Sequence, residues 1–110
     1  MQTAILYMLQ RITALIMAPL VLGHLAIMIV AIQGGLSTTE ILSRTQGSMF
    51  WFLFYGLFVL AVSVHAAIGL RVIVSEMFEM RSLLLNGFTW VTGLAFLFMG
   101  ARAVIAVTML

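Results

Sequence analysis

Two histidines, His24 and His65, carry the side chains of this sequence that are best suited to chemistry. Each lies within a long apolar stretch, where an ionisable side chain is costly and usually has a function. An imidazole nitrogen can bind haem iron, and imidazole can also relay protons. It can equally be a hydrogen-bonded side chain in a face where helices pack. A haem ligand, a proton relay and a packing residue are therefore all open interpretations of both positions.

Small residues surround His65. On a helix its neighbours one turn away are Ala61 and Gly69, and Ala66 and Ala67 follow it directly. A macrocycle that lies against a helix needs such a low surface, so the sequence supplies a ligand and a flat shelf together. The same small residues would also let two helices approach closely.

His24 has a different setting. It follows Gly23, but its neighbours Leu20 and Ile27 are bulkier than those of His65. Pro19, five residues earlier, removes a backbone donor and can kink a helix. Besides ligating a haem, His24 could hydrogen-bond to a neighbouring helix or meet water near the far membrane surface.

The composition places these histidines in a membrane. Apolar residues make up 65% of the 110 positions and charged residues 7%, and the mean hydropathy is +1.27. Such a chain lacks the polar surface of a soluble domain. The absence of cysteine excludes disulfides, thiolate metal sites, iron–sulfur ligation and covalently attached haem. A formal charge of +2 gives no reason to expect a nucleic-acid partner.

The charged residues divide the sequence into three apolar intervals, each able to hold the roughly 20 residues that cross a bilayer as a helix. The first interval is too long for the core of a signal peptide, so we interpret it as a retained helix. The connection "QGGLSTTEILSRTQGS" is polar and could include a short interfacial turn, whereas "MFEMRS" is tight and predicts antiparallel neighbours. We predict an all-α integral membrane protein, a single transmembrane domain over residues 1–110, with helices over about Ala4–Ile32, Ser48–Ser75 and Leu84–Val107.

The arginines indicate an orientation. Arg11, Arg71 and Arg81 fall on the side of the amino terminus, and Arg44 and Arg102 fall near the other side. By the positive-inside rule, this bias of three to two places the amino terminus in the cytoplasm or matrix and the carboxyl terminus outside.

Helix geometry predicts that the two imidazoles lie at different depths. If Arg11 and Arg71 mark one interface, His65 lies about 9 Å and His24 about 20 Å into the membrane, a separation of about 10 Å along the normal. Two axial ligands of one iron lie only about 4 Å apart, because each bond is near 2 Å. We therefore expect that His24 and His65 do not share an iron.

Two motifs resemble a known family. The segment "HAAIGLRVIVSE" resembles the second-helix motif of the succinate dehydrogenase and fumarate reductase cytochrome b subunits, in which histidine, glycine and arginine stand where His65, Gly69 and Arg71 stand here. The segment "LQRITALI" is similar to the family's first-helix His-Arg-x-Ser-Gly signature, matched by Arg11 and, conservatively, by Thr13. The resemblance covers most of the chain.

Three positions depart from the family pattern. Gln10 replaces the histidine of the signature and Ala14 replaces its glycine. Tyr7 stands where a serine often contributes to quinone binding, and its hydroxyl could still donate a hydrogen bond to a quinone carbonyl.

The resemblance implies a cytochrome b membrane anchor of complex II in a bacterial inner membrane. Its partners would be a flavoprotein subunit, which carries out the carbon chemistry, an iron–sulfur subunit and a second membrane anchor. Haem b would be bound at His65, with His24 on a second, distal haem in a two-haem arrangement, and a one-haem arrangement is the alternative. Arg11 and Arg71 would lie near the haem edge, and Arg11, Thr13 and Tyr7 would bind quinone.

Two other classes of protein compete with this interpretation. A haem-free quinone anchor or assembly subunit would retain the arginines without iron. A small transporter or channel subunit would use His24 and His65 as a proton relay.

Overall fold

A computed structural model describes residues 3–108, and these residues form helices without any strand. Three helices are long and apolar enough to cross a membrane, which confirms the predicted all-α membrane fold. A further, short helix lies in the first connection, which the sequence predicted to be a polar loop with room for a short interfacial turn. In chain order the helices are α1 (Thr3–Gly34), α2 (Thr38–Thr45), α3 (Met49–Met77) and α4 (Ser82–Thr108).

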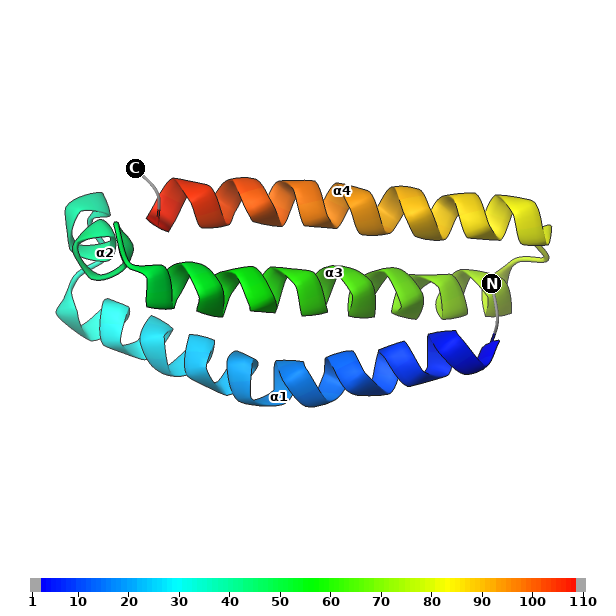
Figure 1. Ribbon diagram of the computed structural model, residues 1–110, viewed down its shortest axis with the longest axis horizontal. Coiled ribbons are helices and arrows are strands. Elements are labelled where there is room, and N and C mark those ends of the chain that lie inside the picture. The colour runs from blue at the N-terminus through cyan, green and yellow to red at the C-terminus, as the bar shows by residue number, and fades with distance from the viewer. Residues whose placement is uncertain (1–2, 109–110) are drawn as a thin grey trace.

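The long helices are apolar on every side, as expected for helices that lipid or other helices surround. Within each helix the backbone satisfies its own hydrogen bonds, which a spanning segment requires. Pro19 lies inside α1 and has no N–H to donate, yet α1 continues through it as one helix. Figure 1 shows α1 as a bowed helix beside a straighter α3.

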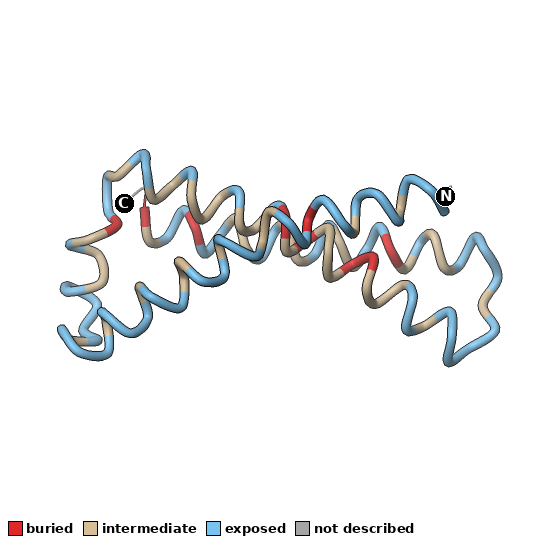
Figure 2. Tube along the Cα trace, turned by 90° about the horizontal axis from the view of Figure 1, so that it is seen from below, coloured by how far each residue is buried: buried red, intermediate tan, exposed pale blue. Residues whose placement is uncertain are grey.

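The three spans form a layer with α3 in the middle (Figure 1). α3 packs extensively against both α1 and α4, whereas α1 and α4 make few contacts with each other. Phe54 of α3 lies against Gly23 of α1, and Ala67 of α3 lies against Gly93 of α4. Small residues thus bring both outer helices close to α3. Figure 2 shows the helices crossing near their middles, where several of the buried positions gather.

The short helix α2 closes one end of the layer. Its N-cap residue Ser37 accepts a hydrogen bond from the Glu40 backbone N–H. Near its other end the Thr45 hydroxyl donates to the Val107 carbonyl at 2.7 Å, and the Gly47 N–H donates to the Thr108 carbonyl at 2.7 Å. These bonds satisfy carbonyls in the last turn of α4 that have no partner within the helix. Gly47 has a positive φ of 74°, which glycine adopts without strain.

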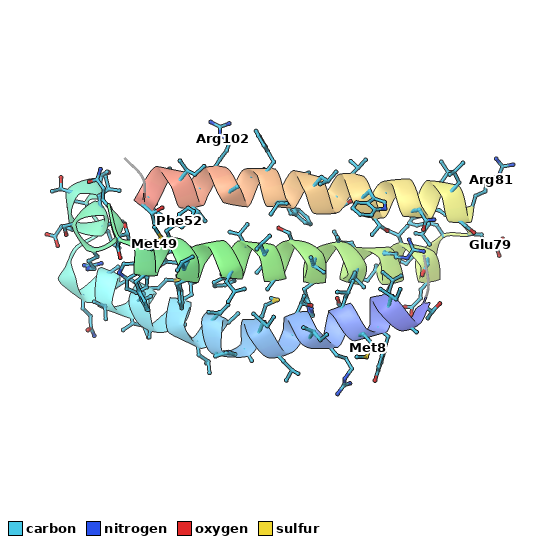
Figure 3. The ribbon with its side chains drawn as sticks, viewed as in Figure 1. Met8, Met49, Phe52, Glu79, Arg81 and Arg102 are labelled. Carbon is cyan, nitrogen blue, oxygen red and sulfur yellow. The ribbon has the colours of Figure 1, made fainter. Side chains whose placement is uncertain are left out.

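The opposite end of the layer carries the tight connection between α3 and α4, and the two helices are antiparallel neighbours as predicted. Glu79 and Arg81 lie at this end (Figure 3). The amino terminus lies at the same end, and the carboxyl terminus lies near α2 (Figure 1).

Candidate site: two imidazoles at different depths

His65 of α3 is joined to α1 by a hydrogen bond. Its Nδ1 lies 3.2 Å from the hydroxyl oxygen of Thr13, a residue 52 positions away in the sequence. Thr13 is buried, and the same hydroxyl oxygen lies 2.7 Å from the Leu9 carbonyl and 3.1 Å from the Gln10 carbonyl. The contact therefore belongs to a small network at the α1–α3 interface.

This network assigns the tautomer of His65. A threonine hydroxyl has one hydrogen and two lone pairs. The shortest contact, to the Leu9 carbonyl, takes that hydrogen, so the hydroxyl oxygen accepts from the Nδ1–H of His65. The other ring nitrogen, Nε2, then has a free lone pair. Metal-binding histidines are commonly oriented in this way by a partner on the nitrogen that does not bind the metal.

The small residues around His65 differ in their exposure: two of them are buried in helix contacts and two are partly exposed. Ala61 and Ala67 are each only 4% exposed, because neighbouring helices cover them. The helix-packing interpretation is therefore right for these two alanines, which cannot form an open shelf for a macrocycle. Gly69 and Ala66 are partly exposed, and Gly69 lies beside the Gln10 amide.

His24 lines a cavity of about 620 Å³ that is bounded by residues of all four helices. Its ring makes edge-to-face contacts with Tyr55 and Phe58, with ring centroids 6.0 Å and 5.4 Å apart. Within residues 3–108 the imidazole has no hydrogen-bond partner. Most of the cavity wall is apolar, with Thr45 and Ser63 adding hydroxyls. The size and lining are typical of a small-molecule site.

The residues that each imidazole contacts show how far apart the two imidazoles lie along the helices. Thr13 lies level with His65, and His24 follows Thr13 by eleven residues, which is about 16 Å along α1. Along α3, the rings that contact His24 belong to Tyr55 and Phe58, which precede His65 by ten and seven residues, or about 10–15 Å. Two ligands of one iron would lie about 4 Å apart. His24 and His65 therefore cannot bind the same iron.

The three residues predicted for quinone binding do not meet in this chain. Tyr7 and Arg11 lie one turn apart on an exposed side of α1, with the guanidinium carbon 5.6 Å from the Tyr7 ring centroid. Thr13 is two residues beyond Arg11, which rotates it by about 200° to the buried side that faces α3.

Arg71 points toward α4. Its Nη1 donates to the Asn86 amide oxygen at 2.8 Å and to the Thr89 hydroxyl at 3.1 Å. Six residues separate Arg71 from His65, so the two side chains leave α3 about 120° apart. The sequence interpretation did not single out Asn86 and Thr89. Their spacing of three residues, which puts polar groups on one side of an apolar helix, was the available signal.

Gln10 is a third residue whose role was not predicted from the sequence. Its Oε1 is buried and has no hydrogen-bond partner among the described residues. Its Nε2 lies beside Gly69, one turn of α3 from His65. A buried acceptor without a donor is costly, which makes this position a place where a donor from outside the chain would be stabilising.

The fold and the site define an integral membrane protein with three spanning helices that hold imidazoles at two depths. A family model described as the succinate dehydrogenase/fumarate reductase transmembrane subunit matches residues 2–107. The chain belongs to this family, which confirms the resemblance found in its motifs, and it is a membrane subunit of that enzyme complex. No curated protein and no solved structure matches the chain.

Proposed function

We propose that this chain is the cytochrome b anchor of a succinate:quinone oxidoreductase or quinol:fumarate reductase. In this role it carries electrons between the iron–sulfur subunit and membrane quinone through haem b. The family match supports the anchor role. The observation that carries the haem proposal is the hydrogen bond of Thr13 with Nδ1 of His65, because it leaves Nε2 free as a ligand.

The residues fit a haem at His65. An imidazole that binds haem iron needs a fixed orientation and a free ring nitrogen, and the hydrogen bond with Thr13 supports both conditions. When bound, haem b supplies a one-electron carrier between the iron–sulfur subunit and quinone. Thr13 would act as the positioning residue, since its hydroxyl contacts His65 itself.

We further propose that His24 binds a second, distal haem. The cavity beside His24 and the absence of a partner for its imidazole within the described chain support this assignment. Because His24 and His65 lie too far apart to bind one iron, each haem would take its other axial ligand from a second membrane anchor. A flavoprotein subunit and an iron–sulfur subunit would complete the complex.

For quinone we propose Arg11 and Tyr7. The cation–π contact holds the guanidinium over the Tyr7 ring, and both side chains can donate hydrogen bonds to a carbonyl oxygen. Both are exposed on α1, so the other wall of this site would come from a neighbouring subunit. Thr13 faces the opposite side of α1, so we do not include it in this quinone site.

Replacement of His65 tests the proposal. In the purified complex, His65→Gln should abolish one b-type component of the reduced-minus-oxidised spectrum and lower haem per flavin in a pyridine haemochrome assay. Ser75→Ala, which removes an exposed hydroxyl elsewhere on α3, is the matched control and should leave the spectrum unchanged. A wild-type complex without a Soret band, or an unaltered spectrum in the His65 variant, would contradict haem ligation here.

A further inference from the structure

The Arg71 guanidinium is held in place without a counter-ion. Its two hydrogen-bond acceptors, the Asn86 amide and the Thr89 hydroxyl, are both neutral. Within the described residues no carboxylate pairs with Arg71, and most of its five N–H donors remain available. A fixed positive charge in a membrane helix is stabilised by an anion.

Helix lengths place Arg71 near the edge of the hydrocarbon layer. The 29 residues of α3 span about 43 Å, which exceeds a hydrocarbon thickness of about 30 Å by about 6–7 Å at each end. Arg71 lies six residues before the end of α3 at Met77, or about 9 Å from it. Trp90, 63% exposed and next to Thr89, is the type of residue that marks this boundary. The guanidinium is therefore within reach of the phosphate layer.

An apolar groove of about 250 Å³ begins at the same level. Thr89 lines it and also accepts the hydrogen bond from Arg71, so the polar cluster and the groove are continuous. The lining runs from Ile68 to Leu60 on α3 and from Thr89 to Leu97 on α4, about 12 Å along each helix. The groove thus leads from the guanidinium toward the middle of the membrane.

We propose that Arg71, Asn86, Thr89 and this groove bind an anionic phospholipid. The phosphate takes the free guanidinium donors, and one acyl chain lies in the groove. A charged phosphate suits an unpaired guanidinium better than a neutral quinone does, because charge-assisted hydrogen bonds are the stronger ones. A haem held by His65 would lie elsewhere, since Arg71 leaves α3 in a direction about 120° away from His65.

The lipid would also complete the packing of the layer. α1 and α4 make few contacts with each other, and Leu6 and Leu9 of α1 line one wall of the groove while Leu97 of α4 lines another. An acyl chain between them would contact both outer helices. The site therefore predicts that an anionic lipid stabilises this face of the subunit.

Native mass spectrometry of the intact complex tests the proposal. The complex is placed in nanodiscs of phosphatidylcholine with a minor fraction of phosphatidylglycerol, and the lipid retained after ejection is counted. We expect selective retention of phosphatidylglycerol, lowered at least about tenfold by Arg71→Gln, a factor that corresponds to about 1.4 kcal/mol. Arg81→Gln removes an equal charge at the same end of the layer, where Figure 3 places Arg81, and should not lower retention.

Two further variants separate the parts of the site. Val64→Phe fills the groove without touching Arg71 and should lower retention, while Arg71→Lys keeps the charge and should retain part of it. Equal retention of both lipids by the wild type would overturn the proposal. So would displacement by inorganic phosphate alone, which would show a phosphate site that does not use the groove. Loss of Soret absorbance in place of lipid in the Arg71→Gln complex would assign the guanidinium to a haem propionate and would also overturn it.

Discussion

The Thr13 hydroxyl of α1 lies 3.2 Å from Nδ1 of His65 on α3 and thereby orients this imidazole. The shorter bond from Thr13 to the Leu9 carbonyl directs the hydroxyl hydrogen away from the ring. Thr13 of α1 therefore leaves Nε2 of His65 on α3 free to bind a ligand. The helix interface and the proposed ligand are parts of one arrangement.

Removal of the Thr13 hydroxyl should weaken haem binding. In Thr13→Val the Nδ1–H of His65 loses its acceptor inside the bundle, and the ring can rotate or change tautomer. Loss of such a partner typically lowers the affinity for a metal about 10- to 100-fold. We expect a lower haem content per flavin, or a shifted midpoint potential of one haem, measured by redox titration of the purified complex.

Thr13→Ser is the matched control, because it keeps the hydroxyl and should keep both haem content and potential near the wild-type values. Identical haem content and potential in Thr13→Val and the wild type would show that Thr13 does not position His65.

His24 should control a separate haem. His24→Gln removes the imidazole from the wall of the 620 Å³ cavity, and we expect one spectral component to disappear while the component that depends on His65 remains. Ser63→Ala alters a hydroxyl that lines the same cavity and should leave both components in place. Low-temperature difference spectra of the two variants measure this. Retention of both components in His24→Gln would show that His24 does not bind a haem.

The sequence was sufficient to predict three membrane-spanning helices and to single out the two histidines within them. Long intervals without charge determine where helices can cross a bilayer, and an intramembrane histidine is recognisable without a fold. The partner of His65 was not predictable, because Thr13 lies 52 residues away and the register of α1 on α3 depends on packing. Gly23 against Phe54 is one of the contacts that set this register.

The direction of Arg71 was also beyond local sequence patterns. An arginine near the end of a span can point toward lipid, a cofactor or another helix, and the rotation of α4 decides which acceptors it meets. The small residues near His65 illustrate the same limit, since a low surface for a macrocycle and a close helix contact need the same side chains. The burial of Ala67 and its contact with Gly93 show that this alanine serves helix packing.

Arg11 should be needed for quinone-linked turnover but not for haem binding. Arg11→Leu removes the cation beside Tyr7 on the exposed side of α1, and we expect the rate of quinone-linked turnover to fall at least about tenfold, the factor that corresponds to loss of about 1.4 kcal/mol of transition-state stabilisation. Haem content should not change, because the residue that positions His65 faces the other side of α1. Activity is measured with a soluble quinone and, separately, with an artificial acceptor that bypasses the membrane subunit.

The control for Arg11 is Arg102→Leu. Arg102 makes a similar contact with an aromatic ring, Phe98, with its guanidinium carbon 5.9 Å from the ring centroid, and Figure 3 shows Arg102 pointing away from the layer on α4. Its loss should leave quinone turnover unchanged. Wild-type turnover in an assembled, haem-containing Arg11→Leu complex would remove Arg11 from the quinone site.

The contact between α3 and α4 should tolerate no larger residue at Gly100. A Cβ atom at this position would lie within 2.5 Å of Val59 Cγ1 and 3.0 Å of Cγ2, so Gly100→Leu must force the helices apart. Overpacking of this kind typically costs about 1–3 kcal/mol. Gly87→Leu on the same helix is the comparison, because a Cβ there would meet nothing within 4 Å.

We expect Gly100→Leu to lower the yield of assembled complex, measured by size-exclusion chromatography, and its midpoint of thermal unfolding, measured by scanning fluorimetry. Gly87→Leu should lower neither quantity. Equal stability of the two variants would show that Gly100 does not pack closely against Val59.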